Sequence, residues 1–291
     1  MLFMGSKSKS IIYPSTLQTQ IYLNKDIIMK AIGYTQSLPI SNPESLIDLT
    51  LTQPIATGHD ILIKVKAIGV NPADYKVRLN MPPAAGESKV IGWDAVGEVV
   101  ATGELTSQFV PGDIVYYAGD ITRQGANAEY QLVDERIVGF KPKSLSDAEA
   151  AALPLTAITA WEILFEHLAI KQTSPEAKEK SDEIILVVGA AGGVGSILVQ
   201  IAKAVTGATV IGTASRESSN AWVKKLGADY VIDHSKPLKA QIDALNIGEV
   251  THVASLNSTD AYFEAYTDLL APFGKIAMID DPEALDITKL K

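Results

Sequence analysis

The sequence contains no cysteine, and this absence excludes several kinds of site at once. Without a thiol the chain forms no disulfide, no thiolate nucleophile, no iron–sulfur cluster and no thiolate zinc site. Histidine is also scarce, because His59, His167, His234 and His252 are the whole complement and no two have the short spacing of metal ligands. We therefore expect no metal site.

Positive charge and long apolar runs are lacking too. The chain has 25 Lys and Arg against 34 Asp and Glu, a net charge of -9. Such a field repels nucleic acid and anionic membranes, so a bound phosphate needs a local cluster of donors. No apolar run approaches the roughly 20 residues that cross a bilayer, and the polar N-terminal stretch does not resemble a secretory signal. We expect a cytoplasmic protein with no nucleic-acid or membrane partner.

What is present indicates two domains in a chain of 291 residues. Residues 1–28 have no sustained period and predict a disordered tail or an upstream extension. From residue 29, short β-rich segments such as "DILIKVKAIGV" and "AVGEVVATG" are separated by Gly, Pro and Asp. A helical pattern then takes over, with Ser146 and Glu149 spaced as a capping box. We place the domain boundary after Leu155.

Residues 156–291 alternate short apolar runs with helical patterns. This alternation predicts right-handed βαβ crossovers and a doubly wound parallel sheet, giving an α/β fold class. Five strands are expected, ending with "KIAMID", whereas such sheets usually have six. We therefore expect the C-terminal part of the fold to be missing, as in a fragment or the product of a truncated gene.

The segment "VVGAAGGVGS" follows the first of these strands and opens a helix. It matches the G-x-G-x-x-G pattern of dinucleotide-binding turns, except that Ala190 replaces the first glycine. Gly192 allows backbone to approach a pyrophosphate, Gly195 allows close packing of helix on strand, and Gly193 and Val194 begin the helix whose N–H groups face the anion. The alternative is a glycine-rich turn without a ligand.

The end of the second strand discriminates between the two nicotinamide dinucleotides. A chain that selects NAD places Asp or Glu there, but this sequence has Ser215 and Arg216. An arginine can bind a 2′-phosphate through two hydrogen bonds, with Ser219 and His234 as further donors. These residues predict NADPH as the cofactor. The alternative is that Arg216 is a solvated loop cation.

Seven motifs in the same order resemble those of the medium-chain dehydrogenase/reductase superfamily, in its zinc-independent quinone oxidoreductase branch. They are "GVNPADYKVR", "IGWDAVGEVV", "PGDIVYYAGD", "GANAEYQLVD", "LSDAEAAALPLTAITAWEILF", "VVGAAGGVGS" and "GADYVIDH". The sequence is most similar to chains called zinc-type alcohol dehydrogenase-like proteins. The resemblance implies a GroES-like β-rich catalytic domain at 29–155 and a Rossmann NADPH-binding domain at 156–291.

The resemblance also bears on the reaction. Zinc-dependent relatives bind the catalytic metal through a Cys in the first motif and a His in the second, whereas this chain has Asn71 and Trp93. Zinc stabilises the alkoxide of alcohol–ketone interconversion. Hydride addition to an enone or quinone instead produces an enolate, which ordinary hydrogen-bond donors stabilise. We therefore predict NADPH-dependent reduction of a quinone or an activated double bond, with a small-molecule partner.

The family resemblance places "NPADYK" in the substrate region. Asn71 is expected to donate its amide to a substrate oxygen or the cofactor, Lys76 to supply a cation near the developing oxyanion, and Asp74 to orient Lys76. Quinone reductases of this branch often have Tyr at the position of Lys76, which leaves the proton donor open. The alternative is a turn at Asn71 with a surface ion pair from Asp74 to Lys76 or Arg78.

Several alternatives stay open at this stage. Thr159 resembles a residue that approaches the nicotinamide carboxamide, and a packed helix-face threonine is the other interpretation. If the C-terminal segment is absent, the chain could be a non-catalytic NADPH-binding protein. An acyl-thioester enoyl reductase shares the fold, and a full-length form could be a homodimer.

Overall fold

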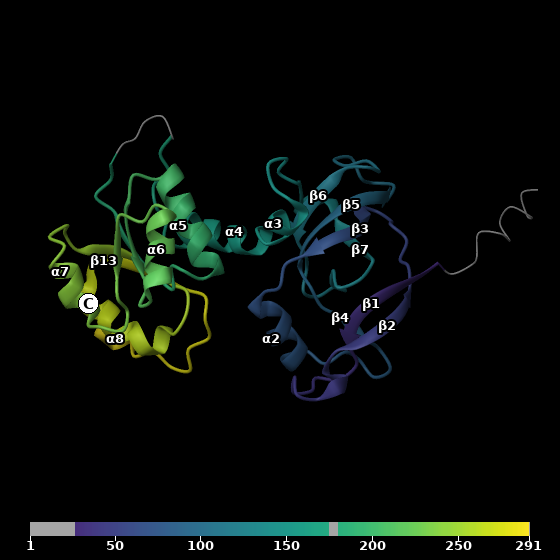
Figure 1. Cartoon of the computed structure of the whole chain (residues 1–291), viewed down its shortest axis with the longest axis horizontal. Helices are drawn as coiled ribbons and strands as arrows, with labels where there is room; N and C mark the ends of the chain where they lie inside the picture. The colour runs from purple at the N-terminus through teal and green to yellow at the C-terminus, as the bar shows by residue number, and fades with distance from the viewer. Residues whose placement is uncertain (1–26, 175–179, 291) are drawn as a thin grey trace, which may run out of the picture. The chain divides into compact units, whose positions relative to one another are not determined.

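The computed structural model describes residues 27–174 and 180–290. The chain divides into two compact units, unit 1 up to Ala148 and unit 2 from Glu149, and Figure 1 labels their elements. The N-terminal tail or extension expected at residues 1–28 lies, but for its last two residues, outside the described part. The first strand, β1, begins at Ile28.

Unit 1 contains two antiparallel sheets. The larger has the order β7-β3-β5-β6-β8 and the smaller the order β2-β1-β4. The strands are β1 (Ile28–Tyr34), β2 (Ile47–Thr52), β3 (Asp60–Ile68), β4 (Lys89–Val90), β5 (Asp94–Thr102), β6 (Ile114–Ala118), β7 (Tyr130–Asp134) and β8 (Val138–Phe140). The predicted β-rich half is thereby confirmed.

Strand β3 shows why this half folds as a sheet. Ile61 and Ile63 are fully buried, whereas Lys64 and Lys66 are exposed. This period of two places the apolar side chains on the core side of the larger sheet. They pack there with residues of β5, β6 and β7, including Val115.

Helix α2 (Pro72–Asn80) was not expected from the sequence, which suggested a turn at Asn71 and Pro72. Pro72 occupies the first turn, where its missing N–H costs nothing and its fixed φ suits a helix. Asp74 adds negative charge to the same turn, where the helix dipole favours it. The segment is therefore a capped helix that starts just after the larger sheet's β3.

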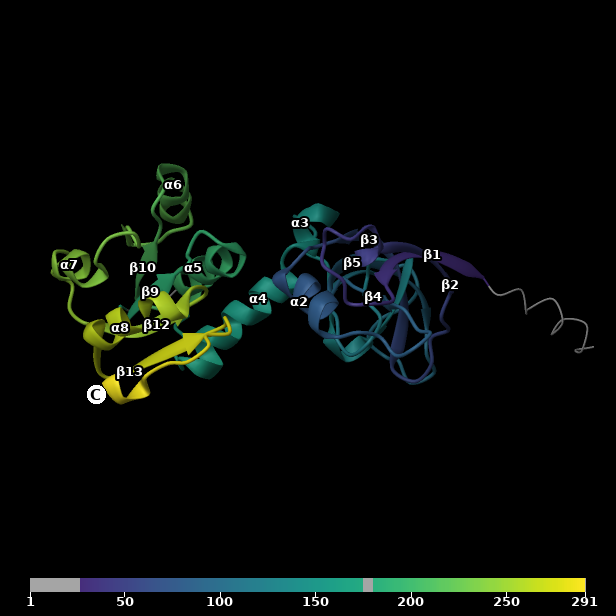
Figure 2. The same cartoon turned by 90° about the horizontal axis from the view of Figure 1, so that it is seen from below.

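Unit 2 contains the predicted parallel sheet. Its order is β11-β10-β9-β12-β13, with all neighbouring pairs parallel. The strands are β9 (Ile184–Val188), β10 (Thr209–Thr213), β11 (Tyr230–Ile232), β12 (Val250–Ser255) and β13 (Leu270–Met278). Figure 2 shows β13 as the yellow arrow at one edge. Five parallel strands of a Rossmann-type domain are confirmed.

Helices cover both faces of this sheet, as Figure 1 shows for α5 and α6 on one side and α7 and α8 on the other. Within β9, Ile185 and Val187 join the core beneath α5, and Ile184, Leu186 and Val188 join the core beneath α8. A strand buried on both faces explains the uninterrupted apolar run of β9. The helices are α5 (Gly193–Val205), α6 (Glu217–Lys225), α7 (Leu238–Asp243) and α8 (Thr259–Leu269).

The helical segment before the parallel sheet has three parts. They are α3 (Asp147–Ala151), α4 (Pro154–Trp161) and the π-helix Glu162–His167. Ser146 directly precedes α3, and the boundary expected after Leu155 falls inside α4. Among the described residues, none of the helices combines the length and the apolar character needed to cross a membrane.

Candidate functional site

The turn after β9 is built by a glycine that precedes the expected pattern. Gly189 has φ +82°, a left-handed conformation that suits glycine. Ala190 does not have a positive φ, and its side chain is fully buried in the core beneath α5. Because Gly189 makes the sharp bend, alanine is accommodated at the position of the first glycine in the pattern.

The remaining glycines leave room for an anion. A Cβ on Gly195 would lie 2.4 Å from the carbonyl oxygen of Gly189, so this position allows helix α5 to pack on the strand end. A Cβ on Gly192 would meet the same oxygen at 3.3 Å and nothing else within 4 Å, so the backbone there is open to approach. Gly193 and Val194 belong to the first turn of α5, where backbone N–H groups lack helical acceptors. These residues fit a pyrophosphate.

Strand β10 holds this turn from the other side. A Cβ on Gly212 would lie 2.5 Å from Val223 of α6 and 3.0 Å from the Cβ of Ala190. The Thr213 hydroxyl oxygen accepts the N–H of Gly189 at 3.2 Å. Neither Gly212 nor Thr213 was expected from the sequence to hold this turn, although a glycine inside the strand pattern "TVIGTAS" indicates a close approach of backbone.

The residues expected to bind a 2′-phosphate lie where β10 leads into α6. Ser215 and Arg216 are exposed, and Arg216 precedes the first residue of α6. Within the described residues, the Arg216 guanidinium has no carboxylate at ion-pair distance. Ser219 instead serves the helix start, because its hydroxyl donates to the Arg216 carbonyl at 2.9 Å and accepts the Arg216 N–H at 3.3 Å.

His234 lies apart from these residues. Its ring is edge-on to the ring of Tyr262 on α8, with the centroids 6.4 Å apart. Its buried Nδ1 has no hydrogen-bond partner among the described residues. His234 does not line the cavity of about 420 Å³ beside Arg216, which is lined by Ala214, Ser215, Arg216, Glu217, Asn220, Ala221, Lys224, Asp233 and Lys236. Lys224 and Lys236 were not expected from the sequence to line this cavity, because their proximity depends on tertiary folding.

Thr159 lies on α4, which packs beside the start of α5. A Cβ on Gly193 would contact the methyl group of Thr156, one turn before Thr159, at 3.4 Å. The Thr159 hydroxyl donates to the carbonyl of Leu155 at 2.8 Å. Its side chain lines a cavity of about 290 Å³ with Glu162, Ile163 and His167, with Ile276, Ala277 and Met278 at the end of β13, and with Ile279, which follows β13. Thr159 thus faces the carboxyl end of β13, the edge at which parallel sheets bind ligands.

In unit 1 the structure brings Asn71 and Asp74 together at the start of α2. The Asp74 carboxylate accepts the N–H of Asn71 at 2.7 Å and the N–H of Gly92 at 3.0 Å. The Asn71 amide nitrogen donates to the carboxylate of Asp94, a fully buried residue, at 3.0 Å. Asn71 is therefore fixed at both its backbone and its side chain.

Asp74 is not a surface residue, since only 7% of it is exposed. Burial raises the pKa of its carboxyl group above the ordinary value, against the opposing effect of the N–H groups of Asn71 and Gly92. Both carboxylate oxygens serve backbone donors, so their observed role is to join α2 to the segment before β5. Lys76 follows on α2 and is half-buried.

Trp93 fills core. It is 2% exposed and packs with Tyr34, Val77 and Ile91. Its indole nitrogen is buried without a hydrogen-bond partner among the described residues, and the Lys89 ammonium lies 5.9 Å from the ring centroid. Neither an indole nor an amide engaged by Asp94 is a zinc ligand.

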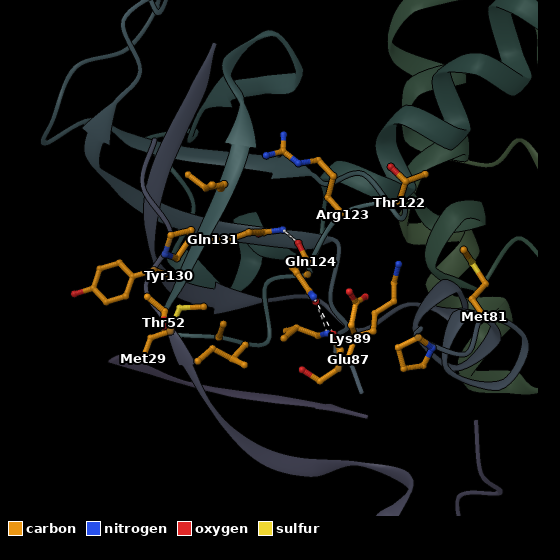
Figure 3. Close-up of a pocket in the computed structure, with 18 of the residues that line it drawn as sticks. Met29, Thr52, Met81, Glu87, Lys89, Thr122, Arg123, Gln124, Tyr130 and Gln131 are labelled. Carbon is orange, nitrogen blue, oxygen red and sulfur yellow. Dashed lines mark hydrogen bonds between the residues drawn. The ribbon is translucent and has the colours of Figure 1, made fainter. Parts of the chain in front are cut away.

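Unit 1 also contains a cavity of about 550 Å³ (Figure 3), and Asn71 is not among the residues that line it. Two polar side chains of its lining, Gln124 and Gln131, are hydrogen-bonded within unit 1. The Gln124 side chain accepts the N–H of Val90 at 2.6 Å and donates to the Ser88 carbonyl at 2.9 Å, and the Gln131 amide donates to the Gln124 carbonyl at 2.9 Å. Apolar side chains such as Met29 and Met81 form much of the remaining wall.

The donor set does not fit a metal ion. In the two described ranges no three His, Asp or Glu side chains are grouped as a metal site would require, and the whole sequence lacks cysteine. The four histidines are also dispersed, for example in β3's neighbourhood at His59 and in β12 at His252. Among the described residues, therefore, the side chains do not form a ligand set that fits the zinc of zinc-dependent dehydrogenases.

Two family descriptions match the two units. The alcohol dehydrogenase GroES-like domain matches residues 57–143, and the zinc-binding dehydrogenase family matches residues 193–288. A zinc-type alcohol dehydrogenase-like protein of Staphylococcus epidermidis is 40% identical over 251 residues, covering 86% of this chain and 73% of the relative. The 2-methylene-furan-3-one reductase of Solanum lycopersicum is 39% identical over 220 residues, covering 72% of this chain and 53% of the relative.

Solved structures agree. A zinc-dependent alcohol dehydrogenase-type protein from Rhizobium etli CFN 42 is 53% identical with a TM-score of 0.85, covering 90% of this chain and 75% of that one. Other solved neighbours are named as quinone oxidoreductases and an enoyl reductase. The motifs, the two folds and the 40% identity together show that the chain belongs to the medium-chain dehydrogenase/reductase superfamily of oxidoreductases, which bind a nicotinamide cofactor.

Proposed function

We propose that this protein is an NADPH-dependent reductase that acts on the activated double bond of an enone or on a quinone, without a metal ion. One observation carries the proposal. Where zinc relatives have Cys and His, this chain has Asn71, whose amide is bonded to Asp94, and Trp93, whose indole lies in the core. A reaction that develops an alkoxide therefore lacks its Lewis acid here.

The chemistry must then suit ordinary hydrogen-bond donors. When bound, the reduced nicotinamide supplies a hydride. Addition of that hydride to a conjugated acceptor leaves an enolate or a hydroquinone anion, which is a much weaker base than an alkoxide and is stabilised by preorganised donors. The tomato relative bears the name of a reductase of a conjugated methylene ketone, and some solved neighbours are named quinone oxidoreductases, which supports this substrate class.

We assign the donors in unit 1 to Asn71 and Lys76. The Asn71 amide is held by Asp94 and its backbone by Asp74, so it presents its group with little loss of side-chain entropy. Lys76 supplies a positive charge for the developing oxyanion. Asp74 is a positioning residue for Asn71, in place of the role toward Lys76 that the sequence suggested. Thr159 lies in unit 2, where we assign it a contact with the carboxamide.

The preference for NADPH rests on the end of β10. Ser215 and Arg216 are exposed there, and no carboxylate stands at the position that would accept from a ribose 2′-hydroxyl. The Arg216 guanidinium can bind a 2′-phosphate in a bidentate manner. We expect Arg216→Glu to weaken NADPH binding at least about tenfold and NADH binding little, because a charge-assisted bidentate contact is exchanged for repulsion.

The test is the loss of NADPH absorbance with a panel of enones, quinones, enoyl thioesters and saturated aldehydes. We expect turnover with enones or quinones and none with saturated aldehydes. Turnover restricted to enoyl thioesters would replace the proposed substrate class, and tight NADPH binding without any turnover would identify a non-catalytic binding protein. Asn71→Ala should lower kcat on the accepted substrate while the NADPH dissociation constant stays within about twofold, since Asn71 acts on the anion that develops.

A further inference from the structure

The cavity beside Arg216 has a second wall that the cofactor-binding pattern does not include. Its first wall is formed by Arg216, which directly precedes α6, and by Asn220 and Lys224 on that helix, so that the three residues follow at intervals of four. Residues four apart lie above one another on a helix, so their side chains line the same side. The second wall is the loop that follows β11 and contributes Asp233 and Lys236.

That loop is organised around Asp233. One carboxylate oxygen accepts the N–H of Ser235 at 2.9 Å and its hydroxyl at 2.6 Å. The other lies 3.4 Å from the ammonium of Lys236. Asp233 is thus engaged by its own turn and holds Lys236 at the cavity, while 69% of the Lys236 side chain stays exposed and its ammonium can reach a ligand.

The charges around this cavity differ from those of the whole chain. Three cations, Arg216, Lys224 and Lys236, line it together with the carboxylates of Glu217 and Asp233. The chain as a whole has a net charge of -9. A cluster of cations in such a field creates a local site for a phosphate, whereas an uncharged ribose hydroxyl gains little from it.

We propose that Lys236, assisted by Lys224, binds the 2′-phosphate of NADPH from the side opposite Arg216 and so adds to the cofactor preference that Arg216 provides. This inference rests on the proposed function. In the loop after β11, the phosphate-binding residue is then Lys236, which lines the cavity, and not His234, which faces Tyr262. A 2′-phosphate carries up to two negative charges at neutral pH and therefore attracts the ammonium away from a single carboxylate.

The test compares dissociation constants of NADPH and NADH, measured from the fluorescence of the bound nicotinamide in the full chain. We expect Lys236→Gln to raise the NADPH dissociation constant about three- to tenfold, as for a charge contact that is partly exposed, and to leave that of NADH within about twofold. Lys224→Gln should have the same sign and a smaller size. Lys236→Arg should retain the NADPH affinity.

Matched controls are available on α6 and on α7, the helix that follows the loop of Lys236. Lys239→Gln removes an exposed lysine that pairs with Asp243 at 2.8 Å, and Lys225→Gln removes a lysine whose ammonium lies 5.7 Å from the centroid of the Trp222 ring. Neither lines the cavity, and both should bind NADPH as the native chain does. A general field effect of lost positive charge would instead weaken binding in the controls as much as in the variants.

The outcomes separate this inference from the proposed function. If the native chain prefers NADPH and Lys236→Gln leaves both constants unchanged, or raises both equally, the inference is overturned and the NADPH preference stands. If the native chain binds NADH as tightly as NADPH, both are overturned. Melting temperatures of the variants should match the native value, because Lys236 is exposed.

Discussion

At the scale of single residues, Glu135 shows how a buried charge organises unit 1. It is 1% exposed, yet its carboxylate accepts the N–H of Gln108 at 2.9 Å and the N–H of Ser107 at 3.0 Å. His59 lies 3.6 Å away. The hydrogen bond from the Gln108 N–H, and to a smaller extent that from the Ser107 N–H, lowers the pKa of Glu135 below its ordinary value. The charged form is thus bound to the loop before β6.

We predict that Glu135→Gln lowers the melting temperature at pH 7. A carboxylate whose pKa is lower in the folded chain stabilises the fold above its unfolded pKa of about 4.3, and this contribution is lost as the pH falls through the folded value. The difference in melting temperature between native chain and variant should therefore be full at neutral pH and shrink below about pH 4. Thermal unfolding followed by circular dichroism across pH measures it.

Glu44→Gln is the control for this prediction. Glu44 is exposed, and in the short helical turn it inhabits, its backbone N–H, not its carboxylate, makes the hydrogen bond, to the side-chain oxygen of Asn42. Its difference from the native chain should be small at every pH. A Glu135→Gln difference that grew in acid would contradict the assignment, since it would mean that the charged form is disfavoured in the fold.

Residue types at the candidate site could be predicted from the sequence, but their partners could not. Arg216 and Ser215 follow from their distance along the chain from the glycine turn. Ser219 and His234 were expected as donors to a phosphate, but the Ser219 hydroxyl bonds to the backbone at the start of α6 and His234 faces Tyr262. Both contacts depend on the local backbone geometry, which the sequence pattern does not give. Lys236 had no signal in the linear sequence, since its loop reaches α6 only through the pairing of β10 with β11.

At the scale of elements, the join between β9 and α5 depends on Gly195. An alanine there would bring Cβ to 2.4 Å from the Gly189 carbonyl oxygen and 2.6 Å from the Cα of Ala190, both of them backbone atoms that cannot yield cheaply. We predict that Gly195→Ala lowers the free energy of unfolding by about 1 to 3 kcal/mol, as overpacking does. NADPH binding should fall more than tenfold in the same variant, because the turn must shift.

Gly193→Ala is the control, because it also replaces a glycine by alanine at the start of α5 but without the close backbone contact. A Cβ on Gly193 would contact the methyl group of Thr156 at 3.4 Å, an ordinary contact distance. Alanine also has the higher helix propensity. Urea unfolding should therefore show Gly193→Ala at or above the native stability. Equal destabilisation of both variants would show that the turn does not depend on the close approach at Gly195.

The elements themselves were predictable where their hydrophobic period was strong. The strands from β9 to β13 and helices α5, α6 and α8 follow from apolar runs and from spacings of three and four residues. Helix α2 was missed although Asn71, Pro72 and Asp74 are typical residues for a helix start. Helix α7 (Leu238–Asp243) was missed because six residues give too little period, and the π-helix Glu162–His167 because its hydrogen-bond shift leaves no sequence signal.

At the scale of the whole molecule, the positions of the histidines decide whether the described residues can bind a catalytic zinc ion. Each histidine has a local structural setting. His59 lies near Glu135, His167 ends the π-helix, His234 faces Tyr262, and His252 hydrogen bonds through Nδ1 to the Thr251 hydroxyl at 2.8 Å. Within the described part of the chain these histidines are dispersed, and the sequence has no cysteine that could complete a zinc site beside any of them.

We predict that exhaustive dialysis against a chelator changes neither the melting temperature nor the NADPH-dependent reduction of the accepted enone or quinone. Removal of a structural or catalytic zinc would lower the first, the second or both, because metal binding contributes directly to folding and to charge stabilisation. Elemental analysis before and after dialysis gives the metal content, and a zinc-dependent alcohol dehydrogenase treated alongside should lose its activity. The contrary result would be one zinc ion retained per chain, with activity that is lost when the zinc is removed and returns when it is added. That result would contradict the metal-free mechanism and would favour alcohol–ketone interconversion as the reaction.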